Sequence, residues 1–172
     1  MADKALISIA SRLLTDEIQL LTGRQGMTGG RFGYTPADNT EGWYYKLTNV
    51  TTTSTDLIAG AIMQKKDSGI AVGSSHATAH ANDKVKFLWI YNTGTTNGSV
   101  ATTDSVYLNF DDAAATNNGK NMFEVPAGMV WFCRTPSTLV GEIHAIAGQA
   151  NAAGTGGGNV HCLVCAVLDD VA

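Results

Sequence analysis

Residues 84–91 read KVKFLWIY, and this stretch decides the fold class of the chain. It is rich in aromatic and β-branched residues, which favour strands. Successive side chains of a strand point to opposite faces. We therefore expect one face to carry Val85, Phe87 and Trp89 and the other to carry Lys86, Leu88 and Ile90. The turn-forming sequence NTGTTNGSVATT follows at 92–103 and ends the strand.

Short apolar runs separated by turn residues continue on both sides of this strand. Further strands are expected at 43–50, 57–63, 69–72, 105–110, 122–125, 129–133, 139–147 and 160–168. This spacing is typical of an antiparallel β-sandwich or jelly roll. The sequence has no strand–helix–strand alternation, which disfavours a parallel α/β fold. It therefore predicts a mainly β domain over residues 41–172.

Residues 1–40 precede this domain and have a different character. Apolar residues between positions 4 and 22 fall near a 3.6-residue period, and Gly23 follows them, which predicts a short helix. The alternation around Ile7 and Ile9 also permits an extended arm. A glycine-rich connection then runs to residue 40. We expect residues 1–40 to form an arm that gains its order on a neighbouring subunit.

The composition favours an assembly role over several other classes. Charged residues make up 15% of the 172 residues, against about 25% in typical soluble domains. The net charge of −4 and the scattered lysines and arginines disfavour nucleic-acid binding. No run approaches the ~18 apolar residues of a membrane span. We expect a soluble chain that is made in a cytoplasm and does not bind membranes.

The candidate metal ligands do not match a known ligand framework. His76 and His80 are four apart, but they lie in a predicted loop. Cys162 and Cys165 lie in a predicted strand, where a spacing of three places them on opposite faces. We expect no metal and no cofactor, and we interpret Cys133, Cys162 and Cys165 as buried free thiols.

No catalytic constellation is expected either. Glu142, His144 and Cys133 could form a nucleophilic triad only if the fold joined them. A more economical interpretation puts Glu142 and His144 on the outer face of a strand. The paired carboxylates at 111–112 and 169–170 fall at strand ends, where adjacent side chains diverge. The sequence therefore predicts a protein that is not an enzyme.

The aromatic cluster Trp43-Tyr44-Tyr45 is the most informative surface candidate. Strand alternation places Tyr44 on one face and Trp43 with Tyr45 on the other. One face belongs to the core. The other is either an exposed aromatic patch for a sugar or a protein, or a second covered face; we expect both faces to be covered.

Five segments between Lys84 and the C-terminus stand out: VKFLWIYNTG (85–94), TTDSVYLNFDD (102–112), VPAG (125–128), LVGEIHAIAG (139–148) and VHCLVCAVLDDV (160–171). Through them, this part of the chain resembles small structural proteins of tailed bacteriophages, in particular capsid decoration (cement) proteins. The resemblance covers about half of the chain. It implies a sandwich or jelly-roll subunit on the capsid exterior that contacts the major capsid protein. It also implies a dimer or trimer, and it brings no catalytic residues.

We accordingly expect a virion structural protein that bridges shell subunits. A tail or fibre component and a sugar-binding β-sandwich are the alternatives. The candidate interface residues are Leu6, Ile9, Leu13, Arg31, Phe32, Tyr34, Trp43 and Tyr45.

Overall fold

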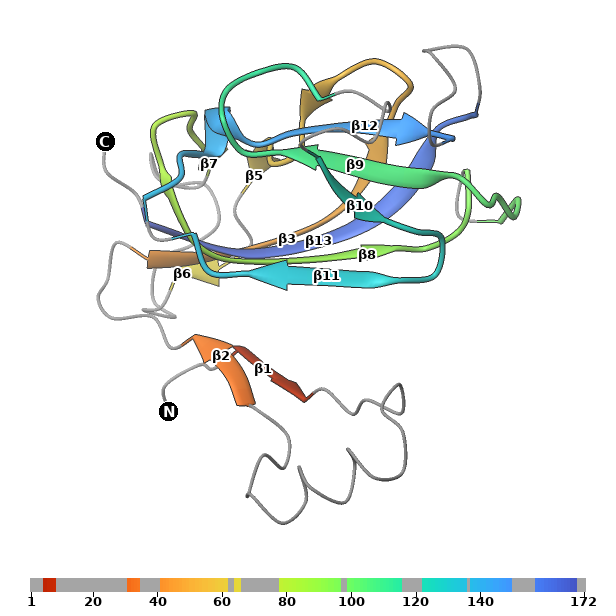
Figure 1. The fold of residues 1–172 in the computed structure, drawn as a ribbon. Helices are drawn as coiled ribbons and strands as arrows, with labels where there is room; N and C mark the ends of the chain where they lie inside the picture. The colour runs from red at the N-terminus through yellow and green to blue at the C-terminus, as the bar shows by residue number, and fades with distance from the viewer. Residues whose placement is uncertain are drawn as a thin grey trace, which may run out of the picture. The chain divides into compact units, whose positions relative to one another are not determined.

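The computed structural model describes residues 5–8, 31–34, 41–61, 64–65, 78–96, 99–115, 122–135, 137–149 and 157–169. The chain divides into two compact units, residues 1–36 and residues 37–172. Two antiparallel sheets form the second unit and face each other as layers (Figure 1). Among the described residues, no helix is both long and apolar enough to cross a membrane.

One sheet has five strands and the other has four. The five-stranded sheet has the order β11 (Val130–Cys133), β8 (Lys84–Asn92), β13 (Val160–Asp169), β3 (Glu41–Val50) and β6 (Gln64–Lys65). The four-stranded sheet has the order β10 (Phe123–Val125), β9 (Ser105–Asn109), β12 (His144–Gly148) and β4 (Thr55–Asp56). β5 (Gly60–Ala61) and β7 (Thr78–Ala79) form a separate two-stranded sheet, and Ala79 packs against the core.

The strand order is that of a jelly roll. Eight strands pair in reverse order along the chain: β3 with β13, β4 with β12, β8 with β11, and β9 with β10. The first four of these strands thus pair antiparallel with the last four, as in one long hairpin that is folded into two layers. The further pairs β8–β13 and β9–β12 complete the two sheets. Apart from the edge strand β6, each sheet has four strands, and their connectivity is that of a jelly roll. The predicted mainly β, antiparallel sandwich fold is confirmed.

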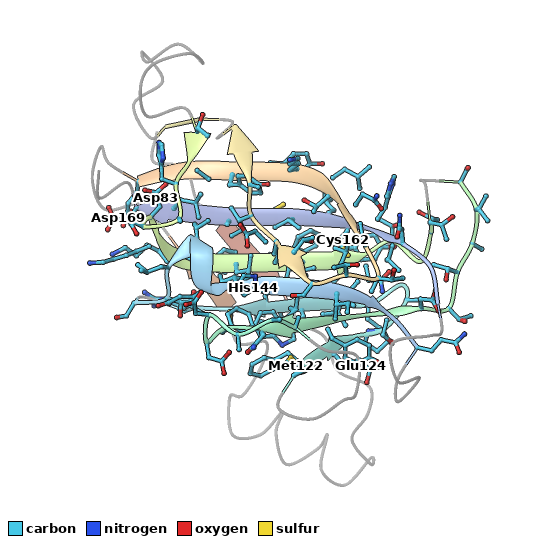
Figure 2. The ribbon with its side chains drawn as sticks, turned by 90° about the horizontal axis from the view of Figure 1, so that it is seen from above. Asp83, Met122, Glu124, His144, Cys162 and Asp169 are labelled. Carbon is cyan, nitrogen blue, oxygen red and sulfur yellow. The ribbon has the colours of Figure 1, made fainter. Side chains whose placement is uncertain are left out.

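The core fills the space between the sheets. β13 alternates as expected, with Val160, Cys162, Val164, Ala166 and Leu168 all buried in it. Further core residues from both layers are Tyr44, Val85, Leu88, Ile90, Val106, Leu108, Ile143 and Ala145. Cys162 lies in the five-stranded layer, between the sheets, and His144 lies on the four-stranded layer (Figure 2).

A β-bulge in β8 changes one of the predicted faces. The register of β8 against β13 shifts between Phe87 and Val85, so that Lys86 is an extra residue. Val85 therefore joins Leu88 and Ile90 in the core cluster between the sheets, whereas Phe87, although buried, is not part of that cluster. The predicted grouping of Val85 with Phe87 and Trp89 is wrong, because an inserted residue inverts the alternation on one side of it. Lys86 instead forms an ion pair with Asp169, with 2.9 Å between Nζ and Oδ2.

Two predicted strands are shorter than expected. Residues 139–147 begin with a 3₁₀ turn, η1 (Val140–Glu142), and only then form β12. Residues 57–63 were expected to form one strand, but Leu57 and Ile58 are buried core residues between β4 and β5. In both places apolar residues of the run are buried. The backbone differs from the expected strand because a short apolar run does not distinguish a strand from a buried turn.

The first unit contains an antiparallel pair of strands, β1 (Ala5–Ser8) and β2 (Arg31–Tyr34). Ala5 pairs with Tyr34 and Ser8 with Arg31. The helix expected over residues 4–22 is therefore wrong at Ala5–Ser8, and the extended alternative describes these four residues. Long-range strand pairing here overrides a helical period, which local sequence cannot anticipate.

The buried side chain of Asn92 joins the two layers at the end of β8. The Asn92 amide nitrogen donates to the carbonyl oxygens of Asp104 and Val125, each at 3.0 Å. Its Oδ1 accepts from the N–H of Gly94 at 2.9 Å. Asn92 closes β8, whereas Asp104 precedes β9 and Val125 ends β10. One fully buried amide thus fixes the end of one sheet to two strands of the other.

Candidate functional site

The side of the five-stranded sheet that faces away from the core is apolar along four neighbouring strands. Cross-strand register places its residues in two rows. One row consists of Val130, Tyr91, Leu163 and Leu47, and the next of Phe132, Trp89, Cys165 and Tyr45. We call these eight residues the outer sheet face. Their strands, β11, β8, β13 and β3, lie side by side in Figure 1.

Three side chains of the outer sheet face are about half exposed: Tyr45 at 49%, Leu47 at 51% and Val130 at 45%. The other five are partly buried. Trp89 and Tyr91 lie next to each other, with 6.3 Å between their ring centroids. Farther along the same side, Phe87 and Val167 are buried. A contiguous exposed apolar patch is a candidate for an interaction site, whereas isolated apolar residues on a surface are not.

The predicted aromatic cluster is only partly covered. Tyr44 lies in the core, and its hydroxyl donates to the carbonyl oxygen of Ala59 at 3.1 Å. Burial raises the pKa of Tyr44. Tyr45 lies on the opposite face, as strand alternation predicts, but it is half exposed. The expectation that both faces are covered is therefore wrong at Tyr45. The side chain of Trp43 lies outside the described residues.

The remaining candidate interface residues belong to the first unit. Leu6 lies in β1, and Arg31, Phe32 and Tyr34 lie in β2; only their backbone is described. Ile9 and Leu13 fall outside the described residues. Their place in an interface stays a prediction.

The sequence did not identify most of the outer sheet face. Leu47, Val130 and Leu163 belong to predicted strands whose apolar runs were equally consistent with burial on both sides. The available signal was the pairing of these runs with Tyr45 across the sheet. That signal depends on the register of β13 with β3 and β8, which local sequence does not determine.

The predicted triad candidates do not come together. Cys133 ends a strand of the five-stranded sheet and packs against the core, whereas His144 lies in the four-stranded sheet. The carboxylate of Glu142 accepts from the backbone N–H of Leu139 at 2.8 Å and so closes the η1 turn. His144 Nδ1 lies 3.2 Å from Asp56 Oδ1. The Glu142 contact holds a local turn and the His144–Asp56 contact joins β12 to β4. Cys133, the predicted nucleophile, lies in the other sheet.

A second polar cluster lies on the four-stranded sheet, where Glu124 is seen beside Met122 (Figure 2). Ser105 Oγ donates to Glu124 Oε1 at 2.6 Å, and the Tyr107 hydroxyl lies 3.3 Å from the same oxygen. Burial is the largest cause that raises the pKa of Tyr107, and the negative charge of Glu124 raises it further. These hydrogen bonds join β9 to β10.

The cysteines and histidines do not form a metal site in the part of the chain that the structure describes. Cys162 points into the core and Cys165 lies on the outer sheet face, so the predicted divergence of the two thiols is confirmed. All three cysteines are free, but only Cys162 is fully buried. His80 is exposed, and its backbone N–H donates to Asp83 at 2.8 Å. His76 lies outside the described residues.

Burial makes the thiols weaker acids than they are in the unfolded chain, which predicts a loss of stability at high pH. It raises the pKa of Cys162 from 9.0 to about 12. The unfolded chain therefore loses this proton first, and the free energy of unfolding should fall as the pH rises from about 9 toward 12. Between pH 7.5 and 10.5, we expect the free energy of unfolding to fall by about 1–2 kcal/mol less in Cys162→Ala than in the wild type. Urea unfolding of both proteins at both pH values measures this; an equal decrease in both contradicts it.

Comparison with known proteins adds no relative. No protein-family model, curated protein or solved structure matches the chain.

Proposed function

We propose that this chain is a non-enzymatic structural protein of a virion, which decorates the exterior of a tailed-phage capsid and reinforces it by bridging shell subunits. The observation that carries the proposal is the outer sheet face. A small protein that leaves Tyr45 and Leu47 of β3 half exposed on the same face of a sheet has a surface suited to an assembly. The jelly-roll strand order and the low charge content support the same role.

Reinforcement follows from the physical chemistry of assembly. A subunit that binds only the assembled shell stabilises that shell by mass action, because its binding free energy is absent from the free capsid proteins. Apolar burial supplies this free energy without a need for charge pairing. The arm formed by residues 1–40 supplies the contact with the major capsid protein, with Leu6, Ile9 and Leu13 as its anchors. The sandwich provides the rigid body that carries the arm.

A sugar-binding sandwich is the second candidate, because Tyr45 and Trp89 lie on one sheet face with Cys165 between them in the same row. Aromatic rings in such an arrangement can stack on sugars. However, their neighbours are Leu47 and Leu163, which offer no hydrogen bonds to hydroxyl groups. Titration with oligosaccharides separates the two functions. Quenching of tryptophan fluorescence supports sugar binding, and an unchanged spectrum supports the structural role.

The position on the particle tests the proposal directly. Antibodies against this chain, applied to purified particles and viewed by electron microscopy, should label the whole head evenly. Labelling confined to the tail or its fibres would replace the proposal with the tail alternative. Particles without any label would contradict a virion role.

A further inference from the structure

We propose that the outer sheet face binds a second copy of this chain, so that two jelly rolls pack through their five-stranded sheets about a twofold axis. The inference deepens the proposed function by naming the partner of this face, and it can fail on its own. It rests on the chemistry of the face, its area and its geometry.

The chemistry of the face is self-complementary. A twofold interface brings the same patch of both subunits together, so every charge on it meets a like charge near the axis. The eight residues of the outer sheet face include no charged side chain. Farther along β8 and β13, Lys86 and Asp169 pair with each other at 2.9 Å. The eight residues of the face therefore place no like charges against each other in a symmetric pair.

The area of the face fits a weak dimer. Eight side chains of roughly 150–200 Å² each, about a third of each exposed, present about 400–500 Å² per copy. A symmetric pair would bury about 800–1,000 Å² in total, which is in the range of weak interfaces. We therefore expect dissociation in the micromolar range, where a high local concentration on a particle favours the dimer.

The geometry permits this packing without rearrangement. Sheets pack face to face at about 10 Å with interdigitated side chains. Each of the two rows places an aromatic residue beside a smaller one, Tyr91 beside Leu163 and Trp89 beside Cys165. A ring of one copy can thus lie over a smaller residue of the other.

Sedimentation velocity of the full chain tests the proposal. Between about 1 and 200 µM the protein should change from a monomer to a dimer of twice the 18.0 kDa chain mass. Leu47→Glu places two unpaired carboxylates in the interface and should raise the dissociation constant by at least about 100-fold. Val100→Glu is the matched control, because Val100 is 56% exposed and lies outside the face. It should leave dimerisation unchanged.

Circular dichroism checks that each variant is folded. Should Leu47→Glu fail to fold, the double variant Tyr45→Thr/Leu47→Thr replaces it, because threonine favours strands. A wild-type chain that stays monomeric at 200 µM, a trimer, or equal association of both glutamate variants would overturn the proposal. The failures are separable: a monomer that still labels the head removes only the dimer, and a dimer absent from particles removes only the decoration role.

Discussion

Replacing Asn92 with alanine should destabilise the sandwich by about 3–4 kcal/mol, a large fraction of the stability of an ordinary domain. The amide of Asn92 is fully buried and satisfies two carbonyl oxygens of the other sheet, those of Asp104 and Val125. It also accepts from Gly94, which has a φ of 67° and begins the turn after β8. Removing the amide leaves three polar groups without partners at one end of the core, and each costs about 1–3 kcal/mol when it stays dry.

Asn109→Ala is the matched control for this prediction. Asn109 is also buried, but its amide nitrogen donates to Ala113, four residues away, and its oxygen accepts from the N–H of Phe110. These bonds hold one loop and do not join the sheets, so we expect a loss of about 1–2 kcal/mol. Urea unfolding followed by circular dichroism measures both variants. Equal losses would show that Asn92 does not act as a bridge between the layers.

Deleting residues 1–40 should abolish attachment to particles while the sandwich stays folded. β3 begins at Glu41, and the second compact unit begins at residue 37, so the deletion removes no strand of either large sheet. The full-length variant Leu6→Asp/Ile9→Asp/Leu13→Asp keeps the arm but removes its predicted anchors, and it should lose at least about 100-fold in affinity. Cosedimentation with particles stripped of this protein measures both variants.

Circular dichroism and the unfolding midpoint serve as controls for the deletion. An unchanged midpoint with lost attachment supports the role of the arm. Retained attachment of the truncated protein would assign shell binding to the sandwich, and the arm would then have no part in it.

Much of the fold follows from the sequence because its long strands carry their signal locally. The apolar run at residues 160–168 became β13, Val160–Asp169, and the run at 84–91 became β8, Lys84–Asn92. Where the prediction failed, the deciding interaction was distant or local geometry was ambiguous. Lys86 forms a bulge because β8 and β13 lose register there, and Ala5–Ser8 is a strand because it pairs with residues more than twenty positions away.

The candidate site was less predictable than the fold. Tyr45 was identified because its aromatic neighbours had to diverge onto two faces. Leu47 and Leu163 carried no such signal, since an apolar residue on a strand is equally consistent with a covered second face. Whether a sheet face is covered depends on how the layers stack, and periodicity along one strand carries no information on that.

The copy number of this chain on purified particles tests the central claim most directly. Particles isolated on a density gradient would be analysed by quantitative mass spectrometry, with the major shell protein as the internal reference. A capsid-wide decoration protein predicts a ratio within a small factor of one. A few copies per particle, or complete absence from the particles, would contradict it.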